Sequence, residues 1–115
     1  MELEYQLHPE PFVFCSLHES IFVEEDIFLF FREAEGNTYV LTKEKAVAKK
    51  IYFKETWALI TVKTITSLNT TGITAHISSI LAQHRMPCNV VAAFHHDHLF
   101  VPFAQRSSAL EILRD

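Results

Sequence analysis

Glycine and proline are scarce in this chain, which has two glycines and four prolines among 115 residues. Disordered segments and collagen-like repeats are rich in these residues, so the sequence fits neither class. Hydrophobic residues make up 49% of the chain, and the chain contains ten phenylalanines. A chain of this length buries roughly two-thirds of the surface that its unfolded form exposes, which suffices for a real core. The composition predicts one ordered, compact globular domain.

The sequence also lacks a dense cluster of lysine and arginine and a long apolar run. Its formal charge of −4 is uneven, because residues 1–56 carry eleven acids and six bases, whereas residues 57–115 carry three acids and four bases. Nucleic acids and anionic membranes attract concentrated positive charge, and a membrane-spanning helix needs about 20 apolar residues. We therefore expect no nucleic acid and no membrane among the partners.

Cysteine is rare as well, since only Cys15 and Cys88 are present, each in an apolar stretch. Neither their spacing nor their context indicates a disulfide or a metal site, so both are interpreted as small buried hydrophobic residues. The first residues do not resemble a signal peptide. These features predict a cytoplasmic protein whose thiols stay reduced.

The first half of the chain predicts three strands and a short helix. Aromatic, β-branched and other apolar residues dominate the strand segments. Gly36 and Asn37 tolerate the positive φ angles that the reversal between the second and third strands requires. Thr42 is a suitable N-cap for the helix, because its hydroxyl can accept a hydrogen bond from the first turn. The expected elements are strands at residues 12–17, 27–32 and 38–42 and a helix at residues 43–50.

Three other segments of this half are not expected to form these elements. Residues 1–11 are polar and contain Pro9 and Pro11, each of which disfavours helix in the residue before it, so we expect an entry segment that is not helical. Residues 18–26 carry an acidic patch and are expected to be a solvated loop. Residues 51–56 fit an edge strand or a linker, and the sequence does not decide between them.

The second half predicts a strand at residues 58–64, which Trp57 starts. Ala58, Ile60 and Val62 share one face of this segment, which is the two-residue period of a strand covered on one side. This face is therefore expected to contribute to the core.

A helix is predicted for residues 71–84, because the apolar residues of this segment recur with the helical period. Thr70 or Thr71 is available as its N-cap, and Pro87 prevents the helix from continuing beyond that point. We expect the apolar stripe of the helix to be buried against the sheet. The stripe consists of Ile73, Ile77, Ile80 and Leu81.

The remaining residues predict a second hairpin and a last helix. Strands at residues 89–96 and 98–103 flank Asp97, which is expected at the turn, and a helix follows at residues 104–114. The apolar residues through which this helix is expected to pack are Ala109, Ile112 and Leu113.

The predicted elements divide the chain into two halves that follow one plan. Residues 1–56 read βββα and residues 57–115 read βαββα, so the first helix of the first half is missing or reduced. Helices on one face of antiparallel sheets define an α+β sandwich of the ferredoxin-like kind.

Three segments, at residues 31–46, 65–82 and 88–102, resemble the small bacterial tandem ACT-domain proteins of unknown function. The resemblance covers nearly the whole chain. Its most specific pieces are Ser-Leu-x-x-x-Gly-Ile-Thr-Ala at residues 67–75 and Asn-Val-Val-Ala, followed after three residues by His-Asp-His-Leu-Phe-Val-Pro, at residues 89–102.

This resemblance implies two tandem ACT-like halves and a regulatory, ligand-binding module that is not an enzyme. ACT domains generally pair side by side, and they bind an amino acid or a similar small effector near the loop before the first helix. The resemblance therefore implies an amino-acid effector and a homodimer, with no cofactor.

The residues themselves support a ligand site at the start of the helix predicted for residues 71–84. A helix N-terminus presents unpaired N–H groups, and Gly72 has no side chain to block an approaching carboxylate. The alternative is that these residues only cap the helix. The resemblance implies an acid in the second hairpin near the ligand's ammonium group, and Asp97 is the candidate. The expected ligand-binding residues are Ser67, Leu68, Thr71, Gly72, Ile73, Thr74, His96 and Asp97.

The cluster formed by His95, His96, Asp97 and His98 allows other interpretations. Imidazoles and carboxylates are common zinc ligands, but successive residues of a strand face opposite ways, so no simple metal site is expected. A solvated polar turn and a small-ligand contact also fit the cluster. No nucleophile, lid or phosphate loop accompanies it, so no catalytic residue is assigned. Besides the sensor, a structural or partner-binding subunit without a ligand and a metal-binding protein remain open.

Overall fold

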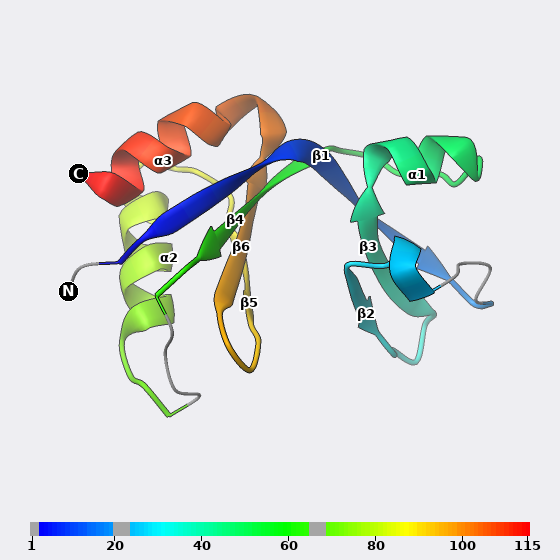
Figure 1. The fold of residues 1–115 in the computed structure, drawn as a ribbon, viewed down its shortest axis with the longest axis horizontal. Helices are drawn as coiled ribbons and strands as arrows, with labels where there is room; N and C mark the ends of the chain where they lie inside the picture. The colour runs from blue at the N-terminus through cyan, green and yellow to red at the C-terminus, as the bar shows by residue number, and fades with distance from the viewer. Residues whose placement is uncertain (1–2, 20–23, 65–68) are drawn as a thin grey trace. The chain divides into compact units, whose positions relative to one another are not determined.

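The computed structural model describes residues 3–19, 24–64 and 69–115, and the chain forms two compact units (Figure 1). The N-terminal unit contains Glu10–Thr56, and the C-terminal unit contains Met1–Pro9 together with Trp57–Asp115. One strand is shared between them, because β1 (Tyr5–Leu17) lies beside β4 (Trp57–Val62) in one unit and beside β3 (Asn37–Thr42) in the other.

β1 is longer than the sequence predicted. The strand predicted to begin at residue 12 begins at Tyr5, so it includes most of the segment expected to be a polar entry segment. Proline disfavours helix but not extended backbone, and it is tolerated in strands where no N–H is needed for a ladder. β1 pairs with β3 only from Phe12, so Pro9 and Pro11 precede that ladder.

The N-terminal unit has the strand order β2-β3-β1, with β2 (Leu29–Phe31) and β1 both antiparallel to β3. Helix α1 (Lys43–Ala48) follows β3 directly. The hydroxyl of Thr42 accepts a hydrogen bond from the backbone N–H of Lys45 at 3.4 Å, which confirms Thr42 as the N-cap. The buried core of this unit is Val13, Cys15, Tyr39, Leu41 and Ala46.

The reversal between β2 and β3 agrees with the prediction at Gly36 but not at Asn37. Gly36 has a φ of 149°, and a Cβ there would lie 2.8 Å from the Ser16 hydroxyl oxygen, so this position requires glycine. Asn37 does not have a positive φ, because it already begins β3. Residues 51–56, which the sequence left undecided, form neither helix nor strand.

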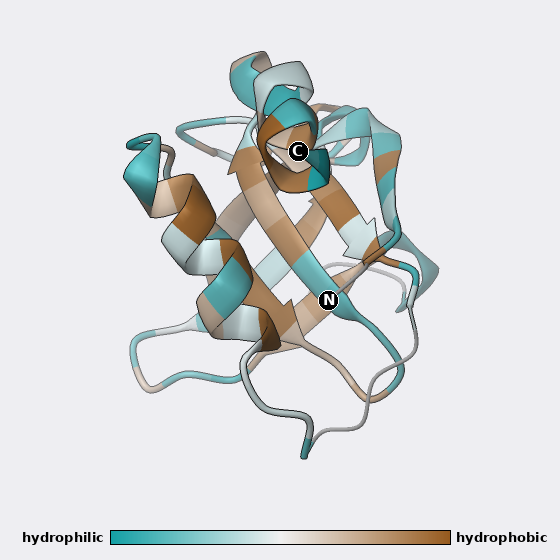
Figure 2. Ribbon diagram, turned by 90° about the vertical axis from the view of Figure 1, so that its left-hand side faces the viewer, coloured by the Kyte–Doolittle hydropathy of each residue, from teal (hydrophilic) through white to brown (hydrophobic). Residues whose placement is uncertain are grey.

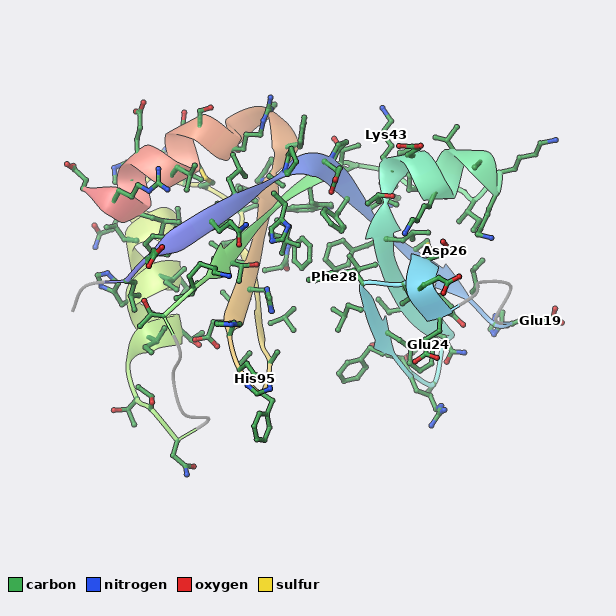
Figure 3. The ribbon with its side chains drawn as sticks, viewed as in Figure 1. Glu19, Glu24, Asp26, Phe28, Lys43 and His95 are labelled. Carbon is green, nitrogen blue, oxygen red and sulfur yellow. The ribbon has the colours of Figure 1, made fainter. Side chains whose placement is uncertain are left out.

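Part of the acidic run expected to be a solvated loop is tied to α1. Glu24–Asp26 form a short 3-10 helix, whose two end residues are labelled in Figure 3. The Asp26 carboxylate lies 3.6 Å from Lys45 Nζ and 3.5 Å from Lys49 Nζ. These ion pairs are partly exposed, so each contributes little to stability. They nevertheless fix where the run approaches the helix.

The C-terminal unit has the strand order β1-β4-β6-β5, with β5 (Asn89–Ala92) and β4 both antiparallel to β6 (Asp97–Pro102). Helices α2 (Ile73–Gln83) and α3 (Arg106–Arg114) pack on one face of this sheet. The strands are mainly hydrophobic, whereas α2 alternates hydrophobic and polar residues (Figure 2). The buried core is Tyr5, Ala58, Ile60, Val62, Ile73, Ile77, Leu81, Met86, Leu99, Val101, Ala109 and Leu113.

The order from β4 to α3 is βαββα, as predicted, and β1 occupies the place beside β4 that completes a ferredoxin-like βαββαβ unit. The α+β, ferredoxin-like fold class is thereby confirmed. The predicted helical stripe is also confirmed, with Ile80 half-buried and its other members buried. None of the helices in the described ranges is long and apolar enough to cross a membrane.

The turn of the second hairpin lies earlier than predicted. β5 ends at Ala92 and β6 begins at Asp97, which pairs with Ala92. The backbone N–H of Ala93 donates to the carbonyl of His96 at 3.1 Å and closes the turn before Asp97 is reached. Asp97 is therefore a strand residue and not the tip of the hairpin.

Candidate functional site

The candidate site is built on the start of α2. Gly72 is the N-cap, with a φ of 88° in the left-handed region, so the prediction that Thr70 or Thr71 caps the helix was wrong. Gly72 has no side chain with which to make a capping hydrogen bond to the first turn. The first N–H groups of an α-helix have no acceptor within the helix, so they are candidates to bind an acceptor from outside it.

The space beside Gly72 is also open. A Cβ built on this residue would meet no atom within 4 Å, so an approaching group has room beside the backbone. A hollow of about 370 Å³ begins here and follows the outer surface of α2. Its lining consists of Gly72, Ala75, His76, Ser79, Ile80 and Gln83.

The start of α2 is held rigidly by its buried face. Ile73 is only 4% exposed and packs in the core with Ile77 and Leu81, so it can offer a ligand its backbone N–H but not its side chain. Thr71 and Thr74 are exposed and can offer hydroxyls. Ser67 and Leu68, also predicted to bind ligand, lie outside the described residues.

Asp97 is the acid of the candidate site. It is the first residue of β6 and is 8% exposed, and it shares one face of the strand with Leu99 and Val101, which face the helices. Within the described ranges its carboxylate has no ion pair and no side-chain hydrogen bond. The β5–β6 hairpin and the first turn of α2 lie at the same end of the C-terminal unit (Figure 1). The acid and the helix N-terminus therefore share one end of the unit, and Asp97 is not among the residues that line the hollow beside Gly72.

The three histidines around Asp97 lie in different environments. His95 is exposed at the tip of the hairpin (Figure 3), and His96 is half-buried with its Nδ1 enclosed and unpaired within the described residues. His98 lies on the sheet face opposite the helices, where its Nδ1 is 2.9 Å from the hydroxyl of Thr61. In the part of the chain that the structure describes, no group of three or more His, Cys, Asp and Glu could hold a metal ion.

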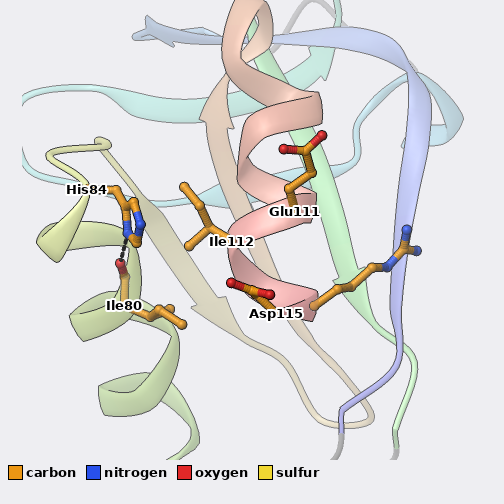
Figure 4. Close-up of a pocket in the computed structure, with 6 residues that line it drawn as sticks. Ile80, His84, Glu111, Ile112 and Asp115 are labelled. Carbon is orange, nitrogen blue, oxygen red and sulfur yellow. Dashed lines mark hydrogen bonds between the residues drawn. The ribbon is translucent and has the colours of Figure 1, made fainter.

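A second hollow, which the sequence did not indicate, lies between α2 and α3. It has a volume of about 580 Å³ and carries Glu111 and Asp115 on one side and His84 on the other (Figure 4). His84 Nδ1 lies 2.9 Å from the carbonyl oxygen of Ile80, one turn earlier. No motif could have revealed this hollow, since it depends on how two helices distant in sequence pack together.

Comparison with known proteins identifies the class. An ACT domain family model matches residues 1–58, and a second ACT domain model matches residues 52–115. No curated protein matches the chain. The chain belongs to the ACT-domain family and carries two such domains in tandem. ACT domains are typically regulatory, ligand-binding modules and not catalytic ones.

Two solved structures are similar to this chain over nearly its whole length. A Vibrio cholerae protein of unknown function, described as a possible transport protein, is 33% identical, with a TM-score of 0.87, and the match covers 95% of this chain and 85% of that one. A protein from Agrobacterium tumefaciens is 14% identical, with a TM-score of 0.81, covering 98% of this chain and 87% of that one. The second similarity concerns the fold alone.

Proposed function

We propose that this protein is a non-catalytic regulatory module that binds a small molecule of the amino-acid class at the start of α2. The observation that carries the proposal is Asp97, a residue that is 8% exposed and whose carboxylate has no ion pair or side-chain hydrogen bond within the described ranges. A largely buried acid that has no ion-pair partner is stabilised when an opposite charge neutralises it. A ligand ammonium would do so.

The other end of the ligand is matched by the helix start. A free amino acid carries a carboxylate a few bonds from its ammonium, so its pocket needs hydrogen-bond donors at one end and an acid at the other. The N–H groups at Gly72, Ile73 and Thr74 would bind the carboxylate, helped by the helix dipole. Thr71 and His96, together with Ser67 and Leu68, which precede them in the sequence, would complete the lining.

A thermal-shift screen against the common amino acids tests this function. A ligand at 100 times its Kd stabilises the folded state by about 2.7 kcal/mol, which is easily measured. In Asp97→Asn the side chain keeps its size, so the melting temperature without ligand should stay within a few degrees. The shift caused by the ligand should vanish, because a desolvated ammonium loses its charged partner at a cost of about 2–5 kcal/mol.

The matched control is Glu111→Gln, which removes a carboxylate from the hollow between α2 and α3. This variant should retain the whole ligand shift. If Asp97→Asn lowers the melting temperature of the free protein and keeps the ligand shift, Asp97 only shapes the strand. If no amino acid shifts the wild-type protein, the alternative of a partner-binding subunit without a ligand is favoured.

We also propose that the protein acts as a homodimer. Strand β2 ends the strand order of the N-terminal unit, and its Phe30 and Phe31 are 41% and 63% exposed. An open strand edge with exposed aromatic residues is a surface that proteins usually cover by pairing. Light scattering at tens of micromolar should give twice the mass of one chain, and a monomer at that concentration would disprove the proposal.

A further inference from the structure

Three polar side chains form a ladder across neighbouring strands of the C-terminal unit. The hydroxyl oxygen of Thr61 on β4 lies 2.9 Å from Nε2 of His8 on β1 and 2.9 Å from Nδ1 of His98 on β6. Thr61 is 5% exposed and sits between Ile60 and Val62, whose side chains face the helices, so the ladder lies on the opposite face of the sheet.

The single proton of the hydroxyl gives this ladder a direction. A threonine hydroxyl donates one hydrogen bond, so only one of the two rings can accept from it and the other must donate to it. Burial lowers the pKa of His98, the imidazoles of His96 and His8 lower it further, and Asp97 acts in the opposite direction. The lowered pKa keeps His98 neutral, and the position of its proton sets the direction of the ladder. With that proton on Nε2, His98 accepts at Nδ1, so that His8 Nε2–H donates to Thr61 and Thr61 donates to His98.

We propose that this ladder is a proton-operated latch, which holds the first residues of β1 on β4 while His98 is neutral and loosens them when His98 binds a proton. Protonated Nδ1 can no longer accept, so two N–H donors would face one oxygen. The buried hydroxyl proton of Thr61 would then have no acceptor, and a positive charge would lie beside His8 and His96. The lost acceptor and the repulsion from His8 and His96 thus disfavour the closed arrangement on protonation, and the attraction of Asp97 offsets part of that effect.

The backbone provides a reporter of the latch. The amide of Lys63, directly after β4, donates to the carbonyl of Glu4 at 2.7 Å, so its exchange with solvent reports separation of β1 from β4. The direction of the pH effect follows from linkage. The pKa of His98 is lower in the closed state than in the open state. The closed state is therefore fully favoured above about pH 6.5, the ordinary pKa of an imidazole, and becomes less favoured as the pH falls toward the lowered pKa of His98.

The experiment is amide hydrogen exchange of the whole protein by NMR at pH 7.5, 6.5 and 5.5, corrected for intrinsic rates. The protection factor of Lys63 should fall several-fold from pH 7.5 to 5.5, with a ceiling of about tenfold for one proton bound per opening. The amide of Ile51, which donates to Ala46 in the N-terminal unit, is the internal reference and should keep its protection.

Two variants separate the latch from general acid destabilisation. In His98→Asn the amide oxygen can accept from Thr61 but cannot titrate, so protection of Lys63 should persist at pH 7.5 and become independent of pH. In His95→Asn an exposed imidazole is removed, and the wild-type pH profile should remain. A flat profile in the wild type, an unchanged profile in His98→Asn, or an equal loss at Ile51 would each overturn the proposal.

A measurement on the unmodified protein tests the proposal even if a variant fails to fold. Nitrogen-15 shifts of the imidazoles at pH 7.5 should show His98 with its proton on Nε2 and His8 with a proton on Nε2. A proton on Nδ1 of His98 would reverse the ladder and refute the latch, whatever the variants do.

Discussion

Replacing Ile77 by alanine tests the packing of α2 directly. Ile77 is 0% exposed and lies in the core of the C-terminal unit. The substitution removes three carbon groups, each worth about 0.8 kcal/mol of transfer free energy, and leaves a cavity that adds a further penalty. We expect the free energy of unfolding to fall by about 2–5 kcal/mol.

Urea denaturation followed by the fluorescence of Trp57 is the appropriate assay, because this sole tryptophan begins β4 in the same unit. The matched control is Ile80→Ala, the same chemical change on the same helix at a half-buried position. It should cost clearly less than Ile77→Ala. A loss under about 0.5 kcal/mol at Ile77, or equal losses at both positions, would mean that the helix is rotated relative to the sheet.

Three further predictions follow from single sites. Thr42→Ala should destabilise by about 0.5–2 kcal/mol in urea denaturation because the N-cap of α1 is lost, whereas Thr42→Ser should be nearly neutral. Gly36→Ala should cost about 1–3 kcal/mol, because of its φ of 149° and the approach to Ser16, and Ser16→Ala should restore only part of the loss. Burial raises the pKa of Cys88 to about 11 and also raises the pKa of Cys15. Both thiols should therefore react slowly with iodoacetamide at pH 8 until urea is added, as followed by mass spectrometry. Equal rates with and without urea would contradict this prediction.

The element types were predictable because local chemistry and the tertiary structure agree in most segments. The stripe through Ile73 and Ile77 has a helical period, and its residues are buried where that period places them. The failure at Pro9 and Pro11 has a different origin. Whether an extended segment becomes a strand depends on partners far away in sequence, and no local pattern records that β4 lies beside it.

The candidate site was predictable only in part. The glycine and the acid could be found because each has a distinct chemical property, a free backbone at Gly72 and a charge at Asp97. Their relation could not be found, since the position of the turn decides whether Asp97 is at a tip or within a strand. The ladder through His8 was also missed, because its members come from three separate segments.

The shared strand β1 has a consequence for how the protein forms during synthesis. Glu4 and Thr64, joined by a hydrogen bond from the Glu4 amide to the threonine hydroxyl, are separated by 60 residues. β1 therefore leaves the ribosome well before β4, and its first residues cannot find their partner until the whole N-terminal unit has been made. Contacts so distant in sequence slow folding and leave strand edges exposed in the meantime. The C-terminal unit is thus the last to close, although its outer strand is made first.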